Sequence, residues 1–156
     1  MSKITPFLWF DNNAEEAVQF YTSIFKNSKI LQTSRYGEAG PGPKGSVMTM
    51  KFELNGQELI ALNGGPHFKF NEAISFVVNC ETQKEVDDYW EKLTAGGKEV
   101  QCGWLTDKYG LSWQITPTIL GQLMSDKDPK KSKRVVQAMM KMVKLDIEGL
   151  KRAYQG

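Results

Sequence analysis

The chain has 156 residues, of which 40% are hydrophobic and 24% are charged, and its formal net charge is +2. This length predicts one domain over residues 1–156, and the composition excludes a disordered or low-complexity chain. No apolar run reaches the ~18 residues of a membrane span, and the N-terminus lacks the apolar stretch of a secretory signal. We therefore expect a cytoplasmic protein that does not enter a membrane.

The charge is unevenly distributed along the chain. Residues 1–126 carry 11 Lys or Arg and 15 Asp or Glu, whereas residues 127–156 carry 9 and 3. A mildly acidic main body argues against a broad nucleic-acid-binding surface. The basic C-terminal segment predicts either a helix packed on the domain or on a dimer mate with its charges in solvent, or a contact with a membrane or nucleic acid. The aliphatic spacing of that segment favours the packed helix.

The first half of the chain predicts one strand, one helix and three further strands. The expected strands are residues 4–10, 29–36, 46–54 and 57–63, and the helix carries an apolar face of Ala17, Phe20, Tyr21 and Ile24. Asn55-Gly56 is a strong hairpin signal between the last two strands. Residues 37–45 are rich in glycine and proline, which is typical of a loop and suits a mobile flap.

The second half repeats this pattern. A strand is expected at residues 73–79, and Thr82 with Glu85 forms a capping box for the next helix. The apolar face of that helix comprises Val86, Tyr89, Trp90 and Leu93, which match the first helix at a constant offset of 69. At the same offset Phe7 falls on Phe76 and Leu8 on Val77. Any two amphipathic strand–helix units could align similarly, but an internal repeat is the favoured interpretation.

The repeat predicts an α+β fold with two tandem βαβββ modules, each unable to bury its own sheet face alone. We place module one at about residues 1–66 and module two at about 70–117. A C-terminal helical extension follows over about residues 118–156, with helices expected at 118–125 and 130–155. In the second of these helices Val135, Ala138, Met139, Met142 and Val143 share one face.

Two cysteines and one histidine restrict the available chemistry. Cys80 and Cys102 are too few for a disulfide framework, so free thiols are expected. Cys102 has no evident base beside it, which favours an inert thiol. His67 is the only histidine, which excludes metal sites built from several imidazoles. It follows Gly64-Gly65-Pro66, where an exposed loop residue is the simplest reading, yet it is also the only ready general acid or base near neutral pH.

Three segments carry a resemblance to a known family. These are residues 4–21 (ITPFLWF followed by AEEA and FY), the run 102–115 (CGWLTDKYGLSWQI), and the methionine-rich tail at 139–150. Together they resemble the vicinal oxygen chelate superfamily, which contains glyoxalase I, extradiol dioxygenases and bleomycin-resistance proteins. More narrowly, the chain resembles the demethylubiquinone methyltransferase-like, or PhnB-like, branch. The resemblance implies half-barrel sheets that enclose a pocket, and commonly a homodimer.

Enzymes of this superfamily hold a metal ion with four ligands from the first and last strands of each module. The corresponding positions here are Thr5, the neighbourhood of Ala61, the neighbourhood of Ile74, and Gln114. Only Gln114 matches a ligand type of the superfamily. Since a divalent cation needs several anionic or imidazole donors, we expect no metal and no other cofactor.

Strand alternation predicts which side chains line the pocket. Thr5, Phe7 and Trp9 share one face of the first strand, and Ser112 and Gln114 share one face of the last, with Trp113 turned away. The full expected set of ligand-binding residues is Thr5, Phe7, Trp9, His67, Phe76, Cys102, Trp104, Ser112 and Gln114. The aromatic members could equally be core, and Gln114 could be a structural amide. Asp107 is expected to organise a turn.

These observations favour a metal-independent protein that binds a small molecule in an apolar pocket, with the ligand and any catalytic residue unknown. The alternative is a lyase, isomerase or dioxygenase-type enzyme with an unusual metal site built from Gln114 and carboxylates such as Glu58. A third possibility is a protein-interaction module acting through residues 127–156. No glycine-rich strand-to-helix turn suits a nucleotide-type cofactor, so the methyltransferase label has no support in the residues.

Overall fold

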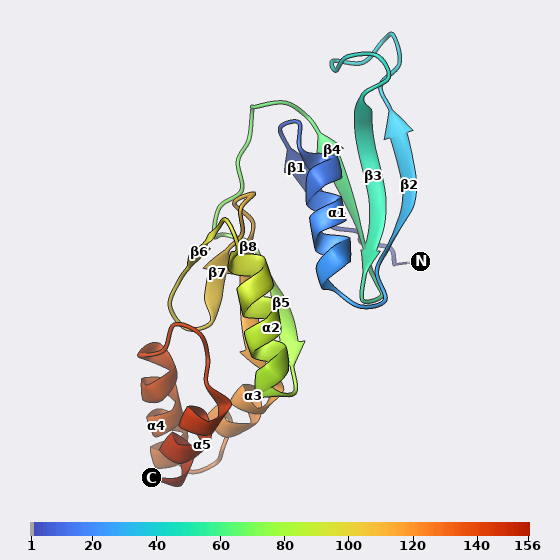
Figure 1. The fold of residues 1–156 in the computed structure, drawn as a ribbon. Helices are drawn as coiled ribbons and strands as arrows, with labels where there is room; N and C mark the ends of the chain where they lie inside the picture. The colour runs from blue at the N-terminus through green and yellow to red at the C-terminus, as the bar shows by residue number, and fades with distance from the viewer. Residues whose placement is uncertain (1) are drawn as a thin grey trace. The chain divides into compact units, whose positions relative to one another are not determined.

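The computed structural model describes residues 2–156, which divide into two compact units, the first ending at Phe70 and the second spanning residues 71–156 (Figure 1). Each unit contains one helix against a four-stranded mixed sheet, and the second also carries the C-terminal helices. The α+β class and the two tandem βαβββ modules predicted from the sequence are therefore confirmed. Among the described residues, no helix is both long and apolar enough to cross a lipid bilayer.

The first unit follows the predicted element order. It contains β1 (Phe7–Phe10), α1 (Ala14–Ile24), β2 (Lys29–Arg35), β3 (Val47–Leu54) and β4 (Gln57–Asn63). The strand order is β1-β4-β3-β2, with β1 and β4 parallel and the other pairs antiparallel. The first strand is shorter than the predicted residues 4–10. Ile4, within that predicted strand, lies outside the observed one and is 82% exposed.

One face of the first sheet packs under α1 (Figure 1). The helix buries Ala17, Val18 and Tyr21 completely, and the sheet buries Phe52 and Ala61 beneath them. The predicted Asn55-Gly56 hairpin is confirmed, because both residues have positive φ angles of 47° and 88°, as a type I′ turn requires. Glycine meets the second of these angles without strain.

The edge strand β2 is irregular. Its pairing with β3 shifts register twice, between Ile30 and Gln32 and again between Ser34 and Arg35. Every residue of β2 except the half-buried Ser34 is exposed. The backbone hydrogen bonds to β3, rather than burial of side chains, therefore hold β2 in the sheet.

The second unit repeats the plan with shorter strands and three further helices. It contains β5 (Ser75–Cys80), α2 (Gln83–Thr94), β6 (Lys98–Glu99), β7 (Trp104–Thr106), β8 (Ser112–Pro117), α3 (Thr118–Met124), α4 (Pro129–Met140) and α5 (Ile147–Gln155). The order β5-β8-β7-β6 and the parallel β5–β8 pair reproduce the first sheet. Thr82 caps α2 as predicted, accepting a 3.2 Å hydrogen bond from the Glu85 amide.

The predicted offset of 69 holds for the helices but not for the strands. Val86, Trp90 and Leu93 are buried in α2 where Ala17, Tyr21 and Ile24 are buried in α1. In β5, however, Phe76 pairs with Trp113, on the side of the sheet that α2 covers. It is Val77 that pairs with Gln114, on the other side. Three residues separate β1 from α1 but only two separate β5 from α2. This one-residue difference reverses the faces assigned to the second strand, since side chains alternate with a period of two.

Asp107 organises the turn between β7 and β8, as predicted. Its carboxylate is only 2% exposed and accepts hydrogen bonds from the Tyr109 and Leu111 amides, at 2.8 and 3.1 Å. The indole Nε1 of Trp113 donates a third, at 2.8 Å. A single buried side chain therefore holds both the turn and the indole that packs on the helix-covered face of the sheet.

The C-terminal helices form a small core of their own, at the red end of the chain in Figure 1. Leu120, Val135, Leu145 and Leu150 are buried together, with Met139 and Met142 packed against them. This confirms the packed-helix interpretation of the basic segment. The predicted helix over residues 130–155 is interrupted, because α4 ends at Met140 and α5 starts at Ile147.

The residues between α4 and α5 attach these helices to the rest of the second unit. The carbonyls of Met142 and Val143 accept hydrogen bonds from the amides of Cys102 and Gly103, at 2.9 and 2.8 Å. The Gln83 side chain donates to the Leu145 carbonyl at 3.1 Å and accepts from the Ile147 amide at 2.8 Å. The C-terminal segment is therefore bonded to the start of α2 and to the turn before β7.

Candidate functional site

The face of the first sheet turned away from α1 is called the first open face. It carries the side chains of alternate residues on four strands, which the register places side by side: Phe7 and Trp9 on β1, Ile60 and Leu62 on β4, Thr49 and Lys51 on β3, and Gln32 and Ser34 on β2. Phe7 is 56% exposed although it is a large apolar residue. The open face thus combines an apolar half on β1 and β4 with a polar half on β2 and β3.

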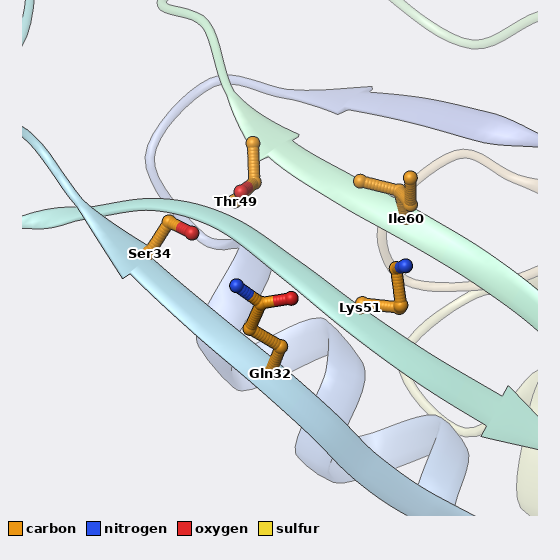
Figure 2. Close-up of a pocket in the computed structure, with 5 residues that line it drawn as sticks. All are labelled: Gln32, Ser34, Thr49, Lys51 and Ile60. Carbon is orange, nitrogen blue, oxygen red and sulfur yellow. The ribbon is translucent and has the colours of Figure 1, made fainter.

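A shallow depression of about 60 Å³ lies on this face, where the two halves meet. Gln32, Ser34, Thr49, Lys51 and Ile60 line it, and we call it the polar notch. Figure 2 shows these side chains projecting from β2, β3 and β4 on the same side of the sheet. Lys51 also contacts Glu58, with 3.4 Å between Nζ and Oε1.

Trp9 is held firmly by the segment that follows β4. Its indole Nε1 donates a 2.9 Å hydrogen bond to the Gly65 carbonyl, and its ring meets Phe68 edge-on with 4.9 Å between centroids. A Cβ atom at Gly64 would overlap the Trp9 indole, so only glycine fits there. Trp9 therefore has a structural role in addition to any contact with a ligand. His67 is exposed beside it, 6.4 Å between ring centroids.

A larger hollow of about 400 Å³ lies at the end of the first sheet, between the loop at 37–46 and the residues after β4. His67 and Asp11 contribute to its lining, together with Tyr36. The base of the loop is bonded to β2, because the Gly45 amide donates to the Tyr36 carbonyl at 2.8 Å. The mobility predicted for residues 37–45 stays a prediction.

Asn63 connects this region to the start of α1. Its Oδ1 accepts a 2.8 Å hydrogen bond from the Ala14 amide, and its Nδ2 donates to the Val47 carbonyl at 3.1 Å. The expected cap residue Asn13 makes no side-chain cap bond. The first turn of α1 is therefore capped by a residue 49 positions further along the chain.

The second sheet has an open face of the same kind, turned away from α2. Gln114 lies there in register with Val77 on one side and Trp104 on the other. The Gln114 Nε2 donates a 3.0 Å hydrogen bond to the Ser75 hydroxyl. Val77 is 50% exposed. Gln114 and Trp104, both predicted from the sequence, are thus brought together, and Ser75 and Val77 join them.

Phe76 was expected on this open face, and that expectation is wrong. Phe76 pairs with Trp113 in register, and the two rings pack at 5.4 Å between centroids on the side of α2. Ile74, which marks one of the four expected metal-ligand positions, precedes β5 and is 58% exposed. The one-residue difference between the repeats described above is the physical reason, and Val77 takes the place that the sequence assigned to Phe76.

Cys102 and Ser112 also differ from expectation. Cys102 lies in a turn with φ of 61°, so the predicted alternation of Val100, Cys102 and Trp104 along one strand is interrupted there. Ser112 is on the open face but only 1% exposed. The other cysteine, Cys80, is fully buried, and burial, with the nearby Glu85 charge, raises the pKa of its thiol to about 12. Cys80 is therefore unsuited to nucleophilic chemistry near neutral pH.

The superfamily implies a divalent cation, and the side chains at the four expected positions do not fit one. Ala61 is buried on the helix side, and its open-face neighbours Ile60 and Leu62 carry no donor. Gln114 and Ser75 are neutral and bonded to each other. Within residues 2–156, no group of three or more His, Cys, Asp or Glu side chains could hold a metal. Such a donor set lacks the anionic and imidazole ligands that these cations prefer.

The residues of the polar notch were missed by the sequence analysis. Thr49, Lys51 and Glu53 alternate with the buried Met50, Phe52 and Leu54 along β3. This period of two is the signal that could have placed Thr49 and Lys51 on the open face. Gln32 and Ser34 on β2 lack this period of two, because the register shifts in that strand interrupt the alternation of side chains between the two faces of the sheet.

Comparison with known proteins agrees with this architecture. A sequence model of the family described as 3-demethylubiquinone-9 3-methyltransferase matches residues 2–116. The PhnB protein of Bacillus cereus, whose structure carries the same family description, is 43% identical, covers 75% of this chain and 100% of its own, and has a TM-score of 0.69. No curated protein matches.

Two more distant structures share the fold alone. A protein of Pseudomonas aeruginosa is 20% identical, covers 75% of this chain and 98% of its own, and has a TM-score of 0.63. A glyoxylase/bleomycin resistance protein/dioxygenase domain from Frankia is 17% identical, covers 75% and 92%, and has a TM-score of 0.50.

Proposed function

Because this chain belongs to the 3-demethylubiquinone-9 3-methyltransferase family, the PhnB-like branch of the vicinal oxygen chelate superfamily, we propose that it binds a small, partly apolar molecule without a metal ion. The supporting observation is the composition of the open faces. Exposed apolar side chains, Phe7 at 56% and Val77 at 50%, share these faces with neutral hydrogen-bonding groups, Thr49 on the first and Gln114 on the second. Ligand sites in proteins typically combine apolar surface with a few polar groups in this way.

The family description alone does not support methyl transfer. Nucleotide-type cofactors are commonly bound where a glycine-rich turn leads from a strand into a helix. The two such turns here, Asp11-Asn12-Asn13 before α1 and Glu81-Thr82 before α2, contain no glycine. Binding, rather than transfer from such a cofactor, is therefore the function that the residues favour.

The ligand-binding residues that we propose follow from the two open faces. Phe7 and Trp9 on the first, and Trp104 and Gln114 on the second, keep the roles predicted from the sequence. Thr5 remains a candidate, because it is half-buried just before β1, and so does the exposed His67. Phe76 is no longer proposed as a ligand-binding residue, and Ser112 and Cys102 are not expected to contact the ligand directly.

We further infer a cytoplasmic homodimer. The superfamily commonly pairs its half-barrels between chains, and both cysteines are free thiols, which suits a reducing compartment. The sites would then lie at or near the interface of the dimer. The native mass spectrometry described below tests the dimer.

The test is native mass spectrometry of the full chain, purified without chelators or a metal-affinity column. We expect a metal-free dimer. A stoichiometric divalent ion would overturn metal independence and favour the enzymatic alternative.

A thermal-shift screen of diverse aromatic and amphipathic compounds then tests binding itself. A compound that binds only the folded state raises the melting temperature. Phe7→Ser, on an exposed side chain of the first open face, should weaken stabilisation by the compounds found. Val100→Ser, also an exposed apolar residue but on the turn before β7, is the matched control. Absence of any stabilising compound across the screen would contradict the proposed function.

A further inference from the structure

The polar notch on the first open face is built from hydrogen-bonding side chains on neighbouring strands. Gln32 and Lys51 are opposite each other in the β2–β3 ladder, and Ser34 and Thr49 form the next pair on that face. Two pairs of polar side chains therefore stand side by side, and Ile60 lies opposite Lys51 on β4. Figure 2 shows the polar atoms of this group around one depression.

The neutral members of the notch have unused hydrogen-bonding capacity. Within residues 2–156, the side chains of Gln32, Ser34 and Thr49 make no hydrogen bond to the protein, whereas Asn63 and Gln114 elsewhere in the sheets are bonded. An amide and two hydroxyl groups can each donate to an acceptor placed between them. No acidic side chain lines the depression.

The charge of Lys51 is only loosely compensated. Its contact with Glu58 measures 3.4 Å, and the two side chains are 31% and 23% exposed. Charge-assisted hydrogen bonds are shorter, at about 2.7–2.9 Å, so the long contact with Glu58 holds the ammonium group weakly. The ammonium group has three N–H donors, and this contact uses at most one of them, so the others can reach a ligand.

The surroundings limit the size and the attachment of the ligand group. A depression of about 60 Å³ accommodates a group of only a few heavy atoms. Its apolar border is Ile60, which is in register with the exposed Phe7 across β1 and β4. A ligand that fills the notch would therefore extend an apolar body over Ile60 and Phe7.

We propose that the polar notch anchors a carboxylate, and that the ligand of this protein is an aromatic or aliphatic carboxylic acid. Lys51 supplies the charge, Thr49, Ser34 and Gln32 supply neutral donors, and Ile60 and Phe7 contact the apolar body. This inference rests on the proposed function and identifies the chemical class of its ligand.

The test compares three probes that share one ring system: 2-naphthoate, neutral 2-naphthamide and the cation 2-naphthylmethylamine. Binding to the full-length protein is measured by isothermal titration calorimetry and by amide NMR shifts at low salt. We expect 2-naphthoate to bind at least about tenfold more tightly than 2-naphthamide, since hydrogen bonds to charged groups are the stronger kind. Shifts should be largest at the amides of Gln32, Thr49 and Lys51.

Two variants assign the preference to the notch. Lys51→Met should remove the preference for 2-naphthoate, and Thr49→Val, which keeps the shape of the side chain, should reduce it by a few fold. Lys26→Met, at an exposed lysine after α1, is the matched control and should leave the preference unchanged. Circular dichroism of each variant checks folding, and Thr49→Val remains informative if Lys51→Met fails to fold.

The outcomes separate this inference from the proposed function. Equal binding of 2-naphthoate and 2-naphthamide, or a preference that survives in both notch variants, overturns the carboxylate anchor while leaving small-molecule binding intact. Binding of none of the three probes also overturns it. Failure of the proposed function is read from the thermal-shift screen, which includes neutral and cationic compounds and does not depend on the notch.

Discussion

The two repeats share one plan but are stabilised differently. In the first, strands of 7 and 8 residues form a broad sheet, and the start of its helix is capped by a distant side chain, Asn63. In the second, β6 and β7 have only 2 and 3 residues. The buried Asp107 carboxylate and the C-terminal helices provide additional contacts that stabilise this shorter sheet. The comparison teaches that a short sheet needs side-chain and helical support, whereas the longer strands of the first sheet rely more on their own pairing.

Removal of residues 127–156 should have the largest effect on this comparison. The deletion removes Val135, Leu145 and Leu150 from the C-terminal core, each contributing about 1.5–3 kcal/mol through burial. The sum is comparable to the whole stability of a small protein. We expect the second unit to lose its fold, measured by solubility and by loss of amide NMR dispersion.

The matched control keeps the helices and removes only charge, by the double change Lys130→Gln and Lys133→Gln. This variant should fold normally, since both side chains are at the start of a helix with an exposed basic face. A soluble, fully folded 1–126 fragment would contradict the structural role of the segment. It would also revive the hypothesis that residues 127–156 act only as an interaction module.

Asp107→Asn should have the next largest effect. The amide nitrogen of asparagine is a donor, and at this buried position it would meet the donors of Tyr109, Leu111 or Trp113. Leaving buried groups unsatisfied costs about 1–3 kcal/mol each, so we expect a loss of roughly 2–4 kcal/mol. Urea unfolding measures it. The control is Asp88→Asn, which should change the free energy of unfolding by under about 0.5 kcal/mol. If Asp107→Asn and Asp88→Asn destabilised the protein equally, the structural role of Asp107 would be contradicted.

Asn63→Ala should destabilise the first repeat by a smaller amount. It removes the cap of α1 and the bond to Val47, and loss of a helix cap costs about 0.5–2 kcal/mol. The midpoint of urea unfolding should fall accordingly. Asn12→Ala, two residues before the helix and exposed, serves as the control and should be neutral. A neutral Asn63→Ala would mean that α1 does not need this cap.

The smallest expected effect concerns acid stability of the second repeat. Hydrogen bonds from Lys144 and then Gln83 lower the pKa of the Asp87 carboxyl below its usual value of 3.8. A carboxyl whose pKa is lower in the folded state stabilises the protein above the unfolded pKa, and this contribution is lost as the pH falls through the folded pKa. Lys144→Met should therefore reduce the dependence of stability on pH below about 4, by under about 0.5 kcal/mol because the pair is half-exposed. Unfolding curves from pH 5 to pH 2 measure it, and an unchanged acid slope would contradict this assignment.

Most of the fold could be predicted from the sequence because its signals are local. The Asn55-Gly56 hairpin, the Thr82 cap and the apolar faces of α1 and α2 each depend on residues a few positions apart. The candidate site depends on strand parity, which one residue reverses. Phe76 was placed on the wrong face for that reason, and Gln32 and Ser34 were missed because β2 carries two register shifts. Asn63 at the start of α1 is a long-range contact that no local pattern encodes.

The same two register shifts in β2 have a consequence for solubility. An outer strand presents unpaired backbone amides and carbonyls, to which a strand from another molecule could add. The shifts interrupt the regular spacing of these groups, and Lys29 and Arg35 place a positive charge at each end of the strand. Repulsion between like charges and the broken spacing together oppose edge-to-edge aggregation. The register shifts that made Gln32 and Ser34 hard to predict therefore also help to keep β2 from pairing with another molecule.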